Sequence, residues 1–203
     1  HICMMTAYTK YLYQAGFRYS QSYIADVLAN NRDITRLLAE LFETKFNPEL
    51  DVSIEERRKM VKEASTRIEL ELTKVTDVAS DTVIKKLLNI INATLRTNFY
   101  QVIETEEDVY RRDGGYKGYI SFKVDSKQVS ELPLPLPYAE IFVYSAKVEA
   151  IHLRGGKVAR GGLRWSDRHE DFRTEVLGLV KAQNTKNAVI VPVGSKGCFV
   201  VKK

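Results

Sequence analysis

The residues best suited to chemistry lie between positions 152 and 199, where glycines and cations alternate at short spacing. This stretch holds seven of the chain's eleven glycines. Glycine pairs occur at 155–156 and 161–162, and two single glycines flank Lys196. Glycine lets the backbone approach a ligand closely or adopt a positive φ. One glycine pair is typical of a plain turn, but three clusters that each carry a cation favour a site that closes on a negative ligand.

Four cations in this stretch could hold a small substrate with two carboxylates: Arg160, Arg164, Lys186 and Lys196. A pair of opposite unit charges about 4 Å apart is worth roughly 4 kcal/mol at an effective dielectric near 20. Arginine offers a carboxylate a planar fork, whereas lysine offers a point charge with a tunable pKa. A lysine that is partly desolvated among other cations loses its proton more easily, which makes it a candidate acid or base at neutral pH.

Three segments in succession carry a family resemblance: ARGGLRW at 159–165, DFRTEVLGLVKAQ at 171–183 and TKNAVIVPVGSKGC at 185–198. Together they resemble the substrate-binding segment of glutamate dehydrogenases, in which KGG(I/L)R, a helix, K(N/T/C)A, a strand and GG(A/G)KGG follow one another. The sequence of these segments is most similar to that of the large NAD-specific enzymes of bacteria, whose chains are several times longer. The resemblance extends upstream and is specific from about residue 133 onward.

The resemblance implies a role for each matching residue. Lys196 stands at the catalytic lysine, which activates the water that attacks the iminium. Lys186 stands at the lysine that binds the main-chain carboxylate of glutamate. Arg160 stands where ordinary glutamate dehydrogenases have a lysine for the side-chain carboxylate, and the large subclass shares the arginine. Gly161 and Gly162 complete the implied substrate-binding set.

Two residues of the GSKGC run depart from the family's pattern. Ser195 and Cys198 stand where small residues, usually alanine or glycine, are expected. A phosphate-binding loop is the alternative for this run. The Walker pattern, however, needs four residues between its first glycine and Gly-Lys-Ser/Thr, and GSKGC does not fit it.

The order of elements predicts where the cations meet. A strand, a helix and a strand in succession favour an α/β layer with its site at a strand's carboxyl end. We therefore expect a strand over 188–193 with GSKG directly after it. The ammonium groups of Lys186 and Lys196 and the guanidinium of Arg160 should then converge on one cleft, within reach of charge-assisted hydrogen bonds to one diacid.

The function implied by the resemblance is the substrate half of an NAD-dependent glutamate dehydrogenase. Such enzymes convert L-glutamate to 2-oxoglutarate and ammonia, so these two acids are the expected partners. No GxGxxG fingerprint follows a strand in the sequence, and hydride transfer needs the nicotinamide held against the substrate. We therefore expect the NAD site to lie outside this chain and the chain alone to be inactive. The full-length protein is expected to be a cytoplasmic homo-oligomer.

Composition limits the class of protein. Hydrophobic residues make up 44% of the 203 residues and charged residues 28%, as in soluble globular proteins. No apolar run approaches the roughly 18 residues of a membrane span, and the start shows no signal peptide. The two cysteines and three histidines are scattered, so free thiols and no metal site are expected. Because the first residue is His1, we expect the chain to be a piece of a longer one.

The net charge of +5 is unevenly placed. Residues 1–150 hold 20 Lys/Arg and 22 Asp/Glu, whereas residues 151–203 hold 11 and 4. A basic block favours nucleic acid or an anionic ligand, so a binding module for RNA or a phosphorylated ligand is the alternative function. Few aromatic residues interleave with the charge to stack bases, which favours a small anion and no nucleic acid. A structural or assembly fragment is a third hypothesis.

Two regions with different patterns predict a mixed α+β or α/β fold. Residues 1–112 are expected to be mainly helical, with four helix-capping residues: Ser20, Asp33, Ser53 and Asp81. Residues 113–203 are expected to begin an α/β glutamate-binding catalytic domain that is incomplete and has no Rossmann domain. Its expected elements are a helix after Asp171 and strands at 119–124, 140–145, 150–154 and 188–193.

Overall fold

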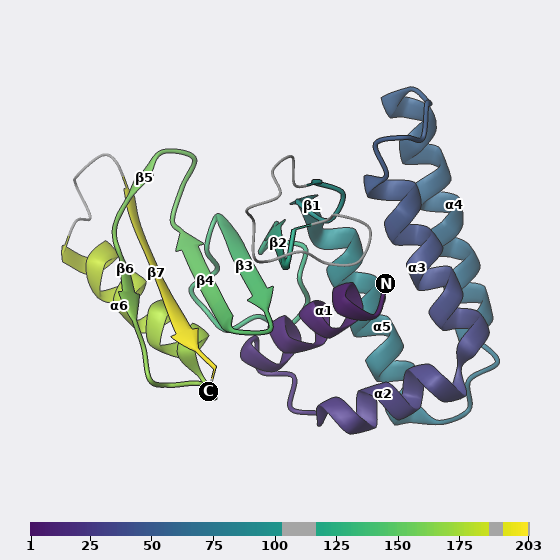
Figure 1. Cartoon of the computed structure of the whole chain (residues 1–203), viewed down its shortest axis with the longest axis horizontal. Helices are drawn as coiled ribbons and strands as arrows, with labels where there is room; N and C mark the ends of the chain where they lie inside the picture. The colour runs from purple at the N-terminus through teal and green to yellow at the C-terminus, as the bar shows by residue number, and fades with distance from the viewer. Residues whose placement is uncertain (103–116, 187–192, 203) are drawn as a thin grey trace.

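The computed structural model describes residues 1–102, 117–186 and 193–202, without the side chain of Lys186. Helices make up most of the first half, and six of the seven strands of the described chain lie in the second half (Figure 1). The predicted mixed α/β class is therefore confirmed. Within the described residues, no helix is long and apolar enough to cross a membrane. The helices of the first half are α1 (Ile2–Gln14), α2 (Gln21–Asn30), α3 (Arg32–Phe46), α4 (Ile54–Leu72) and α5 (Val78–Ala93).

Side-chain caps begin two helices at the predicted residues. The Ser20 hydroxyl accepts a hydrogen bond from the backbone N–H of Tyr23 at 3.1 Å. The Ser53 hydroxyl accepts one from the N–H of Glu56, also at 3.1 Å. Each bond satisfies one of the N–H groups that the first turn of a helix leaves free. The predicted starts of α2 and α4 are therefore confirmed.

The other two predicted caps are wrong, because α3 and α5 begin earlier, after Asn31 and Asp77. The Asp77 carboxylate accepts a hydrogen bond from the N–H of Ser80 at 2.8 Å. Asp33 and Asp81 lie in the first turns of these helices. An acidic side chain is favourable both at the cap and in the first turn of a helix. An acidic residue in the sequence therefore does not show whether it caps the helix or lies in its first turn.

The end of α5 also differs from the pattern. The apolar spacing of residues 84–91 continues at Leu95 and predicts a helix through that residue, but Thr94 begins a strand, β1 (Thr94–Thr97). The Thr94 hydroxyl donates to the carbonyl of Ile90 at 2.8 Å and accepts from the hydroxyl of Tyr8 at 3.0 Å. These buried hydrogen bonds fix the change from helix to strand, which leaves Leu95 exposed.

In the described residues, one sheet has seven strands: β1, β2 (Tyr119–Val124), β3 (Ala139–Ser145), β4 (Val148–Arg154), β5 (Ala159–Arg160), β6 (Leu163–Trp165) and β7 (Val193–Val201). The order is β1-β2-β3-β4-β7-β5, with β6 also paired to β7. β1 to β4 and β7 form antiparallel pairs, whereas β5 and β6 run parallel to β7. The three predicted strands that fall on β2, β3 and β4 are confirmed.

The sheet has an inner face, which packs against α1, α5 and α6 (Phe172–Lys186), and an outer face turned away from these helices. Side chains alternate between the two faces along each strand. One register row lies on the inner face: Phe122, Phe142, Ile151 and Cys198. The next row lies on the outer face: Lys123, Ile141, His152 and Gly197. All four inner-row residues are buried, so the core lies between the inner face and the helices.

One hydrophobic cluster joins the helices to the sheet. The rings of Tyr8 and Tyr11 in α1 lie 4.5 and 6.1 Å from the ring of Phe122. β1, which comes before residue 112, pairs with β2, which comes after it. The division into domains at 1–112 and 113–203 stays a prediction, and the two regions pack against each other through this cluster.

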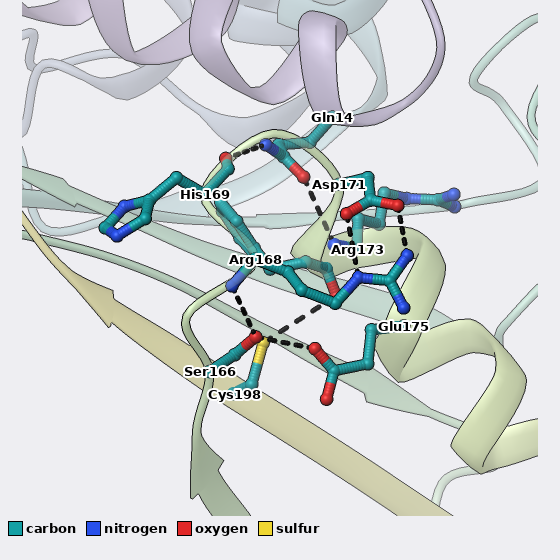
Figure 2. Close-up of polar contacts among 9 residues, drawn as sticks. Gln14, Ser166, Arg168, His169, Asp171, Arg173, Glu175 and Cys198 are labelled. Carbon is teal, nitrogen blue, oxygen red and sulfur yellow. Dashed lines mark hydrogen bonds and ion pairs between the residues drawn. The ribbon is translucent and has the colours of Figure 1, made fainter.

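A buried ion pair ties α6 to the sheet and to α1. The Arg173 guanidinium donates to both carboxylate oxygens of Glu140, at 2.9 and 2.6 Å, and both side chains are 0% exposed. The hydroxyl of Tyr11 donates to the same carboxylate at 3.1 Å. Gln14 accepts a hydrogen bond from the N–H of Arg173 and donates one to the carbonyl of His169 (Figure 2). Three elements therefore meet at one charge pair.

The protonation states of this group follow from its burial. Burial raises the pKa of Tyr11 well above its ordinary value, and the charge of Glu140 raises it further, so the phenol remains a neutral donor. Burial by itself lowers the pKa of Arg173, but Glu140 and then Tyr11 raise it above the ordinary value. The guanidinium therefore stays charged at any pH at which the chain is folded.

Breaking this pair should destabilise the fold strongly. Arg173→Met leaves the Glu140 carboxylate buried without a counter-charge, and we expect a loss of about 3–5 kcal/mol in the free energy of unfolding. Adding Glu140→Leu should recover part of it, because both buried charges are then gone. The measurement is urea unfolding, with Arg168→Met as control, since its partner Asp171 is near the surface and exposed pairs contribute about 1 kcal/mol or less. Equal losses in both variants would contradict the prediction.

Candidate functional site

Two glycine-rich motifs, RGG at 160–162 and GSKG at 194–197, lie side by side in the structure. Arg160 ends β5, and Lys196 lies within β7. β5 pairs with β7 in parallel, with Arg160 opposite Gly194. Just beyond this pair, the carbonyl of Gly162 accepts a hydrogen bond from the N–H of Gly197 at 3.1 Å. The RGG motif therefore runs along the edge of β7 beside the predicted catalytic lysine.

Arg160 and Lys196 lie on the same face of the sheet. A Cβ on Gly194 would meet the side chain of Gln183 in α6 at 2.5 Å, so Gly194 points to the inner face. Lys196 is two residues further along β7 and shares this face, as does Arg160 through its pairing with Gly194. Strands lie about 4.8 Å apart and rise about 3.3 Å per residue, which places the two Cα atoms about 8 Å apart. At this spacing both cations can reach one small anionic substrate.

Charge pairing separates the four predicted cations. Arg164 forms an ion pair with Glu175 of α6 at 3.1 Å, so this carboxylate already balances its charge. Within the described ranges, the exposed guanidinium of Arg160 and the half-buried ammonium of Lys196 have no carboxylate partner. Of the three predicted cations whose side chains the structure describes, these two remain available to an anionic ligand.

Lys186 is the last residue of α6. The side chain of Gln183, one turn earlier, donates to the carbonyl of Arg160 at 3.3 Å, so the C-terminal end of α6 lies against β5. The end of the helix is thus on the same side of the sheet as Arg160 and Lys196. The side chain of Lys186 lies outside the described residues, and the convergence of the three cations on one cleft stays a prediction.

The place of GSKG relative to its strand differs from the prediction. Residues 188–192 of the expected strand lie outside the described part of the chain, and β7 begins at Val193. The GSKG run lies inside β7, where Lys196 is opposite Leu153 of β4. GSKG is therefore at the amino end of β7 and does not follow that strand. The glycines here allow close neighbours on both sides of a strand rather than a turn.

Cys198 packs beneath the start of α6. Its thiol is buried and lies 3.7 Å from the carbonyl of Phe172 (Figure 2). Burial raises the pKa of this thiol to about 12, and Glu175 acts in the same direction. The departure from the family's small residue at this position is therefore a packing feature, and the thiol stays protonated at neutral pH.

The sequence patterns did not single out the buried pair of Arg173 and Glu140, although a signal was present. Arg173 shares the helical spacing of the buried residues Val176 and Val180, and Glu140 alternates with Phe142. A charge placed on an apolar face indicates a buried partner. Among the residues that the structure describes, no group of three His, Cys, Asp or Glu side chains could hold a metal ion.

The two glycines of the RGG motif should respond differently to substitution. A Cβ on Gly161 would lie 1.4 Å from the carbonyl oxygen of Ser195, whereas a Cβ on Gly162 would meet nothing within 4 Å. Gly161→Ala must therefore separate β5 from β7, and we expect it to cost about 1–3 kcal/mol or more. Gly162→Ala is the matched control and should change the free energy of unfolding by less than about 0.5 kcal/mol. Chemical denaturation of both variants tests the contact, and a stable Gly161→Ala chain would contradict it.

Cys198 should make the stability of the fold depend on alkaline pH. An exposed thiol has a pKa near 8.5, as in the unfolded chain, and the folded value is about 12. The unfolded state therefore ionises first, and stability falls as pH rises from about 8.5 toward 12. Compared with Cys198→Ala, the wild type should lose about 2 kcal/mol more between pH 8 and pH 10. Cys3→Ala is the control, and identical pH slopes for Cys198→Ala and the wild type would refute the prediction.

Comparison with known proteins gives two family matches. Residues 67–203 match the family described as bacterial NAD-glutamate dehydrogenase, catalytic domain. Residues 1–48 match the family described as glutamate dehydrogenase, helical motif 3. The first match contains α5, the sheet and α6, and so contains the candidate site, whereas the second contains α1 to α3.

Curated relatives agree with these matches over the whole chain. NAD-specific glutamate dehydrogenases from Halomonas elongata, Pseudomonas aeruginosa and Mycobacterium tuberculosis are 52%, 48% and 46% identical to it over 202 residues. The alignments cover 100% of this chain and 12% of the length of each relative. On the strength of these matches, the chain belongs to the bacterial NAD-glutamate dehydrogenase family.

Proposed function

We propose that this chain is the glutamate-binding part of an NAD-dependent glutamate dehydrogenase, which converts L-glutamate to 2-oxoglutarate and ammonia. The observation that carries the proposal is the pair of cations without carboxylate partners in the described residues, Arg160 and Lys196, held on one face of neighbouring strands. The names of the three relatives support it. It concerns a larger protein, because the chain spans only 12% of each relative's length.

Each residue of the site has a proposed part in the reaction. Arg160 holds the side-chain carboxylate of glutamate through the two parallel N–H groups of its guanidinium. Lys186, at the end of α6, meets the main-chain carboxylate, and the two contacts together fix the position of the α-carbon. Lys196 then acts as acid and base on the water that attacks the iminium. Gly161 lets the backbone lie close to β7, and Gly162 leaves the space next to it without a side chain.

Among the described residues, the start of α6 does not fit the pyrophosphate of NAD. Dinucleotide sites place the pyrophosphate on free N–H groups at the start of a helix, after a GxGxxG turn. At the start of α6 the N–H of Arg173 is already bonded to Gln14 of α1, and no GxGxxG precedes it. NAD is therefore proposed to bind outside residues 1–203, and the chain alone is proposed to be inactive. The complete protein is proposed to be a cytoplasmic homo-oligomer.

The alternative of an RNA-binding module is less well supported. RNA-binding RGG tracts are repetitive and disordered. This chain has two RGG runs, at 154–156 and 160–162. Both are ordered against β7: Arg154 pairs with Ser195, Arg160 pairs with Gly194, and Gly161 packs directly on the backbone of Ser195. An ordered motif of this kind favours a pocket for a small anion.

The role of Arg160 can be tested in a chain that joins this segment to its NAD-binding domain. Arg160→Gln removes a two-point contact to a carboxylate, so the KM for glutamate should rise about tenfold or more, with a smaller change in kcat. Arg58→Gln, an exposed arginine of α4, is the matched control and should leave both constants unchanged. A variant with unaltered KM and reduced kcat would show that the side-chain carboxylate is held elsewhere.

A further inference from the structure

A basic groove crosses the outer face of the sheet. Its volume is about 400 Å³, and it is lined by residues of β1 to β4 and of the segment after β1. Three of its side chains are cations, Arg96, Lys123 and Arg154, and no acidic residue is among those that line it in the described chain. The groove therefore has a net positive charge that its own walls do not cancel.

Two of these cations face each other across neighbouring strands. Arg96 of β1 is the register partner of Lys123 in β2. The register of the two strands shifts by one residue after Thr94, and this irregularity sets Arg96 at that position. Like charges directly opposite each other destabilise a sheet. β1 is an edge strand of the described sheet, and bulges are common both at sheet edges and next to active sites, where they re-aim a side chain. The repulsion between Arg96 and Lys123 therefore destabilises the sheet when no anion is bound, and a bound anion would remove it.

The described part of the chain supplies no counter-charge for this pair. Lys123 is half-buried and Arg96 is exposed, and neither has a carboxylate partner there. The Arg154 guanidinium donates to the carbonyl of Lys157 at 2.8 Å, which orients the side chain without neutralising it. Partial burial of an unpaired ammonium is unfavourable, so a ligand that brings negative charge gains from all three cations.

The wall of the groove is held in place by a buried asparagine. Asn98 donates to the carbonyl of Tyr119 at 3.2 Å and accepts a hydrogen bond from the N–H of Ser121 at 2.7 Å. These bonds continue the pairing of β1 and β2 past the end of β1. The Ser121 hydroxyl lines the groove and provides a further donor. The donors are thus placed by the sheet itself, which lowers the ordering cost of binding.

We propose that this groove is a binding site for a doubly charged oxyanion, a phosphate group or a dicarboxylate, seated between Arg96 and Lys123 with Arg154 beside it. Both ligands offer several oxygen acceptors and two negative charges, which match the two facing cations. The site is separate from the glutamate site, because Lys123 and Arg154 lie on the outer face and Lys196 lies on the inner face. It does not depend on the proposed enzyme activity.

Thermal unfolding of the 203-residue chain at low ionic strength tests the proposal. Inorganic phosphate, succinate and sodium chloride are compared at equal ionic strength. At about a hundred times its Kd, the binding anion should raise the melting temperature by about 5 °C or more, whereas chloride should not. Lys123→Gln should reduce this gain by at least half and weaken binding about tenfold in calorimetry. Lys127→Gln, an exposed lysine outside the groove, is the control and should keep the full gain.

A second readout separates a lost ligand contact from a damaged fold. Without added anion, Lys123→Gln should melt at the temperature of the wild type or above it, because the repulsion from Arg96 is removed. A variant that is no less stable alone yet gains little from the anion supports the site. Stabilisation by phosphate only assigns a phosphate group, and stabilisation by succinate assigns a dicarboxylate. Equal gains from chloride, or a full gain in Lys123→Gln, would overturn the proposal.

Discussion

The buried ion pair between Arg173 and Glu140 is the interaction on which the arrangement of this chain depends. Removing two charges from water costs several kcal/mol for each ion, and only close hydrogen bonding at more than one point offsets that cost. The pair meets this condition with two contacts under 3 Å and a third from Tyr11. Because a small displacement would leave a charge without a partner, α6, the sheet and α1 must keep one relative position. Apolar contacts alone tolerate such displacements more readily.

This constraint extends to the candidate site through the rigidity of α6. The ion pair fixes the first turn of a helix of 15 residues, which is about 22 Å long. The far end of the helix then lies against β5, where Gln183 bonds the carbonyl of Arg160. On the other side, Gly161 rests on the backbone of Ser195. The cations are thus positioned by backbone packing and by a helix anchored at a distance, and not by contacts among themselves.

Much of the fold could be predicted from the sequence, because local patterns decide it. The alternating residues of β2 and the capping serines of α2 and α4 lie where the patterns place them. The end of α5 could not be predicted, since one of the two hydrogen bonds of the Thr94 hydroxyl there comes from Tyr8, which is distant in the sequence. The motifs led to Arg160 and Lys196, but the pairing that makes them neighbours is a property of the sheet. The position of GSKG inside β7 was missed because glycine is typical of both turns and tight strand packing.

The distance along the chain between the partners of the buried network bears on how the protein is made. Gln14 bonds to Arg173, which is 159 residues later in the sequence. A ribosome that adds about 5–20 residues per second needs about 8–30 s to cover this interval. The sheet residues that cover Tyr11, Phe122 and Phe142, are made before α6. The last hydrogen bonds that hold α1 in place can therefore form only after the start of α6 has been synthesised.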